Sequence, residues 1–163
     1  MSNPFFENFN TPFETIPFSQ IKTEHFMPAI EKAIEIGRSN IESILSNPDT
    51  PNFINTIEDF ETANEHLGMI AGAYWHLFGA HSEEEHKKLA DEISMKMPGY
   101  QNDYVLNKSL FLKIETVYNN RNNENLDVHQ MKPTEDVYTF FKRNGAALSD
   151  DDKIKLRNID KEL

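Results

Sequence analysis

The sequence contains no cysteine, and this absence excludes several classes of protein. Without thiols the chain has no disulfide framework, no thiol nucleophile and no thiolate metal site. A long apolar run is also missing, because the uncharged residues 67–80 are too few to span a bilayer, which takes about 20 apolar residues. The first residues lack the basic and apolar regions of a signal peptide. We therefore expect a cytoplasmic protein.

Positive charge is scarce as well. The chain has 27 Asp and Glu against 16 Lys and Arg, which gives a net charge of −11. Nucleic acids and anionic membrane surfaces are both bound through clustered Lys and Arg. We therefore expect no nucleic-acid partner and no membrane partner, and we interpret the acidic excess as a determinant of solubility.

Sustained alternation of apolar and polar residues, the pattern of a half-buried strand, is also absent. Apolar residues recur instead at helical spacing. The sequence predicts an all-α fold, a bundle or array of about six helices preceded by an extended arm. The expected helices cover residues 23–46, 52–80, 82–97, 107–120, 127–144 and 149–163.

Several helix ends are marked by particular residues. Pro98 and Gly99 are expected to stop the third helix, and Gly145 to cap the end of the fifth. Pro133 lies inside the fifth helix and is expected to kink it or to move its start to a later residue. Three pairs have the spacing of helix N-terminal caps: Ser82 with Glu85, Asp127 with Gln130, and Ser149 with Asp152.

Residues 1–22 are rich in proline and phenylalanine. Proline at this density prevents a regular helix, whereas disordered tails are poor in aromatic residues. We expect an extended arm whose Phe side chains dock onto the body of the protein. The predicted organisation is therefore an N-terminal arm, residues 1–22, followed by a helical domain, residues 23–163.

The uncharged residues 67–80 are expected to form the centre of this domain. An uncharged helix of this length in a soluble chain is typical of a buried core helix. Gly68 and Gly72 would let neighbouring backbones come close. The pattern leaves open whether residues 52–80 form one helix or two helices with a kink near these glycines.

The densest group of histidine and glutamate is the segment HSEEEH, residues 81–86. A zinc-peptidase helix needs His-Glu-x-x-His, because histidines four apart share a face. His81 and His86 are instead roughly 140° apart around a helix. Glu83 with His86 matches half of the carboxylate–histidine motif of metal-binding four-helix bundles, and no second copy is present. We therefore interpret the segment as a helix cap.

His76 stands beside the only tryptophan, Trp75, within the uncharged stretch. A buried histidine can act as a base, but this stretch supplies no acidic partner. We interpret His76 as a core or groove residue. The residues themselves predict a helical domain with no catalytic residue, no metal ligand and no cofactor-binding residue.

Residues 17–30, PFSQIKTEHFMPAI, resemble the opening of the thimet-oligopeptidase-like zinc metallopeptidases, which typically begin Pro-Phe-x-x-Ile-Lys-x-Glu-His-x-x-Pro-Ala. Three further segments match the family in the same order: residues 51–57, PNFINTI; residues 107–111, NKSLF; and residues 144–163, which start with NGAALSDDDK. The opening NPFF is most similar to the peptidyl-dipeptidase branch, also called dipeptidyl carboxypeptidase, and oligopeptidase A belongs to the same family.

The resemblance implies a role rather than a chemistry. It implies the non-catalytic N-terminal helical lobe of a zinc-dependent oligopeptidase, which walls the substrate channel and restricts entry to short peptides. The zinc-binding His-Glu-x-x-His of the family lies far downstream and has no counterpart here, so zinc is expected in the parent enzyme only. We expect the chain to be cut at residue 163 from a longer enzyme. Its partners would be the C-terminal catalytic part of the same chain and short peptides.

Three residues near the end of the uncharged stretch are candidates for the channel wall under this resemblance: Trp75, His76 and His81. The alternative is a stand-alone helical protein-interaction module without enzyme activity, which would dock through its Phe-rich arm. The coding sequence beyond residue 163 distinguishes the two hypotheses, because only the peptidase requires a His-Glu-x-x-His far downstream.

Overall fold

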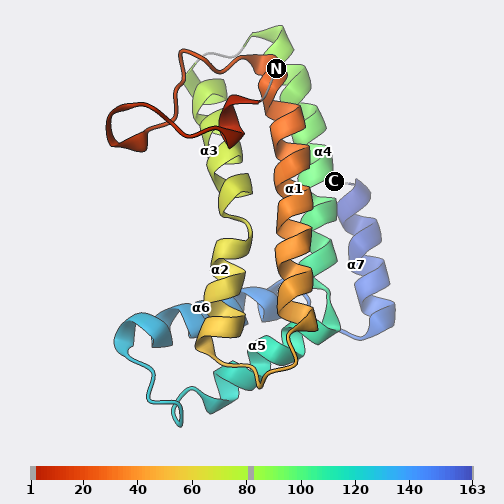
Figure 1. The fold of residues 1–163 in the computed structure, drawn as a ribbon. Coiled ribbons are helices and arrows are strands. Elements are labelled where there is room, and N and C mark those ends of the chain that lie inside the picture. Colours follow the sequence, from red (N-terminus) through yellow and green to blue (C-terminus); the bar gives the residue numbers. More distant parts are fainter. Residues whose placement is uncertain (1–2, 81–82, 163) are drawn as a thin grey trace. The chain divides into compact units, whose positions relative to one another are not determined.

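The computed structural model describes residues 3–80 and 83–162, and within them it confirms the all-α prediction (Figure 1). Helices, turns and short irregular segments make up this part of the chain, and no strand occurs in it. The elements are η1 (Pro4–Phe6), η2 (Pro12–Glu14), α1 (Thr23–Ser46), η3 (Phe53–Glu58), α2 (Asp59–Ala63), α3 (Glu65–Ala80), α4 (Glu84–Val105), α5 (Lys108–Asn120), α6 (Val128–Arg143) and α7 (Asp150–Glu162). None of these described helices has the length and apolar character required to cross a membrane.

The chain divides into two compact units. The first unit contains Met1–Arg38 and Asn64–Ser94, and the second contains Ser39–Ala63 and Met95–Leu163. The boundary predicted between an arm, residues 1–22, and a helical domain, residues 23–163, stays a prediction.

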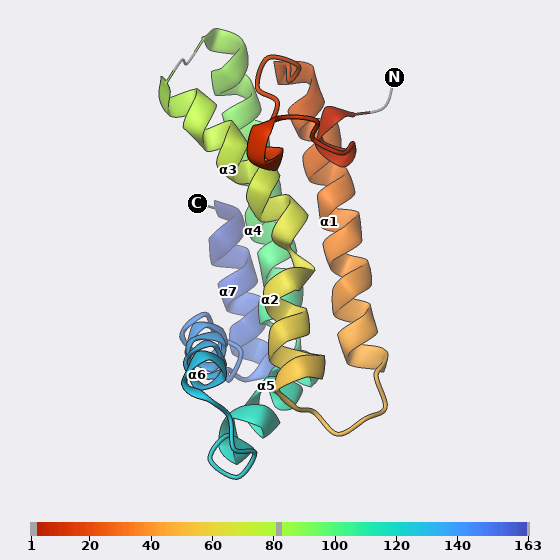
Figure 2. The same cartoon turned by 60° about the vertical axis from the view of Figure 1, so that its left-hand side comes forward.

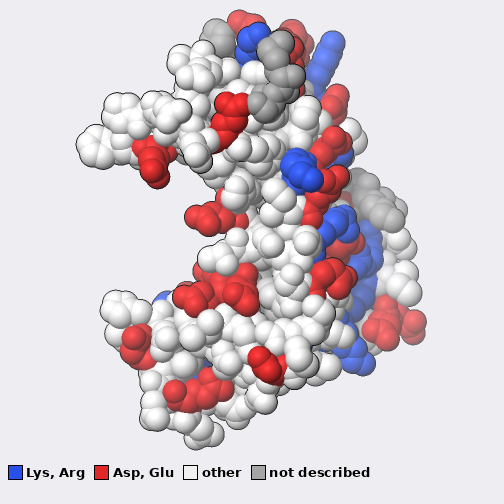
Figure 3. All heavy atoms as spheres, in the orientation of Figure 1, with Lys and Arg blue, Asp and Glu red and all other residues white. Residues whose placement is uncertain are grey.

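In the first unit, the start of the arm docks onto the first turn of α1. Phe5 is only 2% exposed, and its ring centroid lies 5.2 Å from that of Phe26. The side-chain amide of Asn3 donates a hydrogen bond to the His25 carbonyl at 2.7 Å. Phe13 of the arm, in contrast, is 98% exposed and is not docked. In Figure 3 the arm is mostly uncharged, with a few acidic side chains.

Residues 52–80 form three helical segments. Asn52 caps η3, a π-helical segment, because its side chain accepts from the Asn55 N–H at 3.0 Å. The helix is interrupted at Asn64, between α2 and α3 (Figures 1 and 2). α3 continues through both glycines, and the Gly68 N–H already donates to the Asn64 carbonyl at 2.9 Å. The question left open by the sequence is thereby answered: residues 52–80 are not one helix, and the break falls at Asn64 and not near Gly68 and Gly72. Asparagine favours turns over helix interiors.

α3 buries one face rather than its whole circumference. Its buried residues are Leu67, Ile70, Ala71, Ala73 and Tyr74. A Cβ atom built on Gly68 or Gly72 would meet nothing within 4 Å. The expectation that these two glycines let a neighbouring backbone come close is therefore wrong, because they lie on the side of the helix away from its buried face.

The stop expected at Pro98 and the later start of the fifth helix expected from Pro133 are also wrong, whereas a kink at Pro133 stays a prediction. α4 runs through Pro98 and Gly99 to Val105, and α6 begins at Val128 despite Pro133. A proline removes one backbone donor from a helix. Each helix nevertheless continues, because packing of the apolar residues that follow outweighs local propensity. The buried residues after the two prolines include Tyr100, Val105, Val137 and Phe141.

Helix starts that depend on local caps are confirmed. The Asp127 side chain accepts hydrogen bonds from the N–H groups of His129 and Gln130 at 2.8 and 2.9 Å, and the Asp127 N–H donates to the Gln130 side-chain oxygen at 3.2 Å. The Asp152 N–H donates to the Ser149 hydroxyl at 3.2 Å. The cap expected at Ser82 lies outside the described residues.

The second unit is built on a core to which α1, η3, α2, α5 and α6 contribute. α5 packs on α6, and both pack on η3. The Phe141 ring lies 5.0 Å from that of Phe60 and 6.5 Å from those of Tyr104 and Phe111. On the face drawn in Figure 3, basic and acidic side chains lie side by side over α7.

α6 ends in a glycine cap, as predicted. Gly145 has φ +92°, the Ala146 N–H donates to the Phe141 carbonyl at 3.0 Å, and the Gly145 N–H donates to the Lys142 carbonyl at 3.4 Å. These two bonds define the Schellman motif. A Cβ atom at Gly145 would lie 2.7 Å from Leu156 Cδ2, so the backbone conformation and the packing both require glycine here.

We predict that Gly145→Ala lowers the free energy of unfolding by more than about 1 kcal/mol, because alanine is strained at positive φ and would clash with Leu156. Gly99→Ala is the matched control. Gly99 lies inside α4 with nothing near its Cβ position, so alanine should raise the stability by about 0.5–1 kcal/mol. Urea denaturation followed by circular dichroism measures both, and equal effects of the two substitutions would contradict the assignment.

We also predict that Phe5→Ala lowers the free energy of unfolding by about 3 kcal/mol, because it empties a buried site against Phe26. Phe13→Ala removes the same atoms from an exposed position and should change the stability by less than about 0.5 kcal/mol. Thermal unfolding of the two variants measures the difference. If Phe5→Ala were as neutral as Phe13→Ala, the arm would not be docked in solution.

Candidate functional site

An uncharged strip on the exposed side of α3 is the candidate functional site. Gly68, Gly72, Trp75 and Gly79 occupy positions i, i+4, i+7 and i+11, which places them on one side of the helix. Trp75 is 42% exposed, and a Cβ atom on any of the three glycines would meet nothing within 4 Å. We call these four residues the glycine–tryptophan strip. They present backbone and one indole ring, without any charge.

The indole ring of Trp75 is supported by two neighbouring rings. The ring centroid of Tyr74 lies 5.0 Å away and that of Phe78 lies 5.7 Å away, both in edge-to-face geometry. Tyr74 is fully buried and packs edge-on against Phe26 at 5.3 Å. Trp75 is therefore supported by Tyr74, which is fixed in the core of the first unit, and by the half-buried Phe78, which itself stacks on Tyr74.

The Tyr74 hydroxyl ties α3 to α4 within the same unit. It donates a hydrogen bond of 2.5 Å to the His86 carbonyl. Burial, and then the negative charge of Asp91, raise the pKa of Tyr74 above its ordinary value. His86 Nε2 lies 3.3 Å from the Thr23 hydroxyl at the start of α1. This contact agrees with a hydrogen-bonded structural histidine rather than a metal ligand.

Of the three predicted channel-wall residues, the structure describes two. Trp75 lies in the strip, and His76 follows it on α3, exposed and about 100° further around the helix. His81 lies outside the described residues. The channel-wall role of all three stays a prediction. Sequence reasoning missed the three glycines as part of a surface, although their spacing relative to Trp75 was the signal that could have found them.

The described residues were also searched for a metal-binding site. Among residues 3–80 and 83–162, His, Asp and Glu side chains nowhere form a group of three or more that could hold a metal ion. The donors present do not fit a zinc site, so no step of a reaction is assigned to them.

The chain was also compared with known proteins. No family model matches it. The dipeptidyl carboxypeptidase of Escherichia coli strain K12 is 30% identical over 160 residues, which cover 98% of this chain and 24% of that protein. The dipeptidyl carboxypeptidase of Salmonella typhimurium is 27% identical over 99% of this chain and 24% of that protein. Oligopeptidase A of Escherichia coli strain K12 is 24% identical over 91% of this chain and 21% of that protein.

This chain resembles a fragment of a thimet-oligopeptidase-like enzyme. The resemblance inferred from four sequence segments is thereby confirmed. The chain spans about a quarter of the length of the dipeptidyl carboxypeptidases that it matches. It is a peptidase-related helical domain, and its glycine–tryptophan strip contains Trp75, one of the residues predicted for a channel wall.

We predict that Tyr74→Phe lowers the free energy of unfolding at neutral pH by about 1 kcal/mol, because it removes the hydrogen bond to the His86 carbonyl. At alkaline pH we expect the substitution to have a second effect, which favours the stability of the variant over that of the unsubstituted protein. The pKa of Tyr74 is raised in the folded state, so the unfolded chain ionises first and the unsubstituted protein loses stability as the pH rises above 10. Tyr74→Phe should reduce this loss.

Tyr104→Phe is the control, because burial also raises the pKa of Tyr104. It should reduce the alkaline loss of stability without the hydrogen-bond effect at neutral pH. Denaturation curves of the two variants from pH 7 to pH 11 separate these contributions. The variant that carries both substitutions should lose less stability between pH 7 and pH 11 than the unsubstituted protein. An equally large loss of stability would contradict the raised pKa values of the two tyrosines.

Proposed function

We propose that this chain is the non-catalytic N-terminal helical lobe of a zinc-dependent oligopeptidase of the peptidyl-dipeptidase type. In this proposal it walls the substrate channel and restricts entry to short peptides. The observation that carries the proposal is the match of nearly the whole chain to about a quarter of the dipeptidyl carboxypeptidases. The catalytic part of the same chain would be its partner, and the parent enzyme would hydrolyse peptide bonds with zinc held there.

The glycine–tryptophan strip supports this role. Where a residue lacks a side chain, the main chain of an extended peptide can come close to the helix surface. Trp75 adds an aromatic face that packs against apolar and aromatic side chains without requiring a particular sequence. His76 adds a polar ring on an adjacent side of α3. A surface of this kind suits a wall that many short peptides pass.

One observation favours the alternative, a stand-alone helical interaction module. Phe13 is 98% exposed and Phe18 is 47% exposed, both on the Phe-rich arm that such a module would use for docking. The coding sequence beyond residue 163 separates the module from the peptidase lobe. A His-Glu-x-x-His far downstream supports the peptidase lobe, and an immediate stop codon supports the module.

We predict that Trp75→Ala in the parent enzyme changes the ratio of kcat/KM for long peptides to that for short peptides. Loss of the indole ring widens the channel at this point while leaving the distant chemistry intact. A several-fold rise in the relative rate for longer peptides is expected, with a smaller change for His76→Ala. A graded series of fluorogenic peptides that share one cleavage site measures the ratio.

Leu112→Ala is the matched control, because Leu112 is an exposed apolar residue on α5 in the other unit. It should leave the ratio unchanged. The proposal fails if all three variants show the same ratio as the unsubstituted enzyme. It also fails if the 163-residue chain alone binds stoichiometric zinc and cleaves peptides, which metal analysis and the same fluorogenic assay would reveal.

A further inference from the structure

Two tyrosines from different helices of the second unit stack face to face. The ring centroids of Tyr118 on α5 and Tyr138 on α6 lie 3.8 Å apart, and the two ring planes differ by only 10°. Aromatic pairs in proteins more often have centroids about 4.5–7 Å apart, in offset or edge-to-face geometry. Two phenol rings are therefore held in direct contact here, each lying over the other.

Neighbouring side chains hold the pair in place. The guanidinium carbon of Arg121 lies 3.8 Å from the centroid of the Tyr118 ring. Two groups at van der Waals distance cannot share one face of a ring, so Arg121 covers the face of Tyr118 opposite Tyr138. Arg121 Nη1 donates to the Tyr118 carbonyl at 2.5 Å, and its Nε lies 3.4 Å from a Glu135 carboxylate oxygen, an ion pair rather than a hydrogen bond. The Phe111 ring lies 5.8 Å from that of Tyr138, with the planes 15° apart, and is itself buried.

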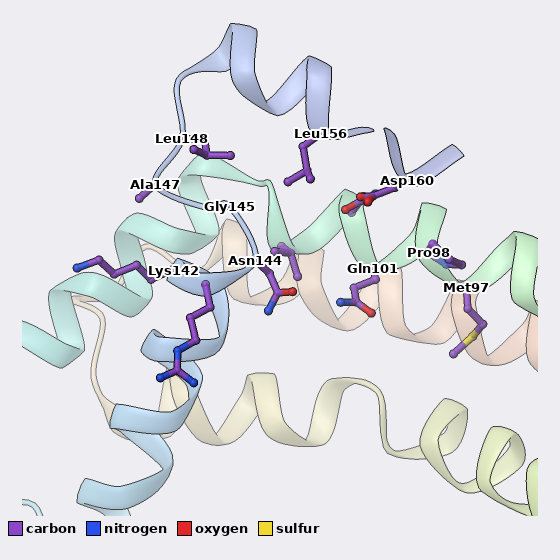
Figure 4. Close-up of a pocket in the computed structure, with 13 residues that line it drawn as sticks. Met97, Pro98, Gln101, Lys142, Asn144, Gly145, Ala147, Leu148, Leu156 and Asp160 are labelled. Atoms are coloured by element: carbon purple, nitrogen blue, oxygen red, sulfur yellow. The ribbon is translucent and has the colours of Figure 1, made fainter. Parts of the chain in front are cut away.

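The pair remains accessible from solvent. Both tyrosines are half-buried, whereas Tyr74 is fully buried. Lys142, whose ammonium lies 5.5 Å from the centroid of the Tyr138 ring, is exposed and lines a cavity of about 660 Å³ between α4, α6 and α7 (Figure 4). Neither Tyr118 nor Tyr138 lines this cavity, but solvent reaches the edge of their stack.

Phenols that face each other can be joined by oxidation. A one-electron oxidant removes an electron and the hydroxyl proton from each phenol, which leaves two phenoxyl radicals. The unpaired electron of each radical is shared with the carbons ortho to the oxygen, and one such carbon of each ring forms a new carbon–carbon bond. Each of these carbons then loses its hydrogen as a proton, and each oxygen regains a proton. With hydrogen peroxide as the terminal oxidant, two phenols and one hydrogen peroxide give one dityrosine and two waters.

We propose that Tyr118 and Tyr138 form an oxidation-sensitive site, at which a haem peroxidase with hydrogen peroxide joins α5 to α6 through a dityrosine bond. Groups held in contact react as if each were present at a very high concentration, so this pair reacts in preference to tyrosines of separate molecules. The bond closes the chain between the two helices into a loop and thereby restricts the unfolded chain. The inference does not depend on the proposed function.

The second tyrosine pair of this unit provides an internal comparison. Tyr100 and Tyr104 lie one turn apart on α4, with ring centroids 5.3 Å apart and planes at 68°. In this geometry the edge of one ring meets the face of the other, so the rings do not lie over each other. Tyr100 is also only 4% exposed. We expect no cross-link at this pair.

Treatment of the dilute 163-residue chain with a haem peroxidase and hydrogen peroxide tests the proposal. The monomer should gain dityrosine fluorescence and lose the mass of two hydrogen atoms, in a yield that does not change on dilution. Proteolytic digestion should release a peptide that contains Tyr118 joined to one that contains Tyr138, which mass spectrometry identifies. The cross-linked chain should also unfold at a higher urea concentration than the untreated chain.

Conservative substitutions assign the cross-link. Tyr118→Phe and Tyr138→Phe each keep a ring in the stack and remove only the hydroxyl that forms the radical. Each should lower the yield of cross-linked monomer at least about tenfold. Tyr100→Phe is the matched control, because it removes one hydroxyl from the edge-to-face pair. It should cross-link as the unsubstituted chain does.

The proposal is overturned if the treated monomer contains no dityrosine, or if the bond joins any tyrosines other than Tyr118 and Tyr138. It is equally overturned if Tyr118→Phe gives as much cross-linked monomer as the unsubstituted chain. Circular dichroism before oxidation checks that the two stack variants are folded. If either is not, the cross-linked peptides of the unsubstituted chain decide the outcome.

Discussion

Each unit depends on one buried aromatic side chain that joins segments far apart in sequence. In the first unit it is Tyr74, whose ring contacts Phe26 of α1 and whose hydroxyl bonds the His86 carbonyl of α4. Phe26 in turn holds Phe5 of the arm. In the second unit it is Phe141, against which rings of α2, α4 and α5 pack. Because helices are oriented by what they bury, these buried aromatic contacts also determine which helix faces each unit exposes.

The sequence predicted those features of the fold that short-range interactions decide. Asp127, Ser149 and Gly145 satisfy free backbone groups at helix ends through neighbours a few residues away, so their caps can be recognised without the rest of the chain. The predictions based on Pro98 and Pro133 were wrong. The cost of the backbone N–H that each proline lacks can be read from the local sequence, whereas the burial of apolar side chains that offsets this cost depends on the tertiary structure. The break at Asn64 has no proline or glycine beside it, and only the structure locates it.

The same distinction between local sequence and tertiary packing applies to the candidate surfaces. Trp75 and His76 could be selected from their place in an uncharged stretch, but recognising the strip that contains Trp75 required knowing which face of α3 is buried. The stacked tyrosine pair was beyond sequence reasoning, because Tyr118 and Tyr138 come from two helices whose packing brings their rings together. No local pattern marks such a site. In the sequence each looks like an ordinary aromatic residue of a helix.

In the proposed role, the glycine–tryptophan strip would recognise ligands by shape, because it offers main chain and one aromatic ring and carries no charge. A protein with a net charge of −11 repels acidic ligands in general. The four residues of the strip are uncharged, so they add nothing to that repulsion. This is why we place the proposed contact with peptides on the strip and not on the charged faces of the chain.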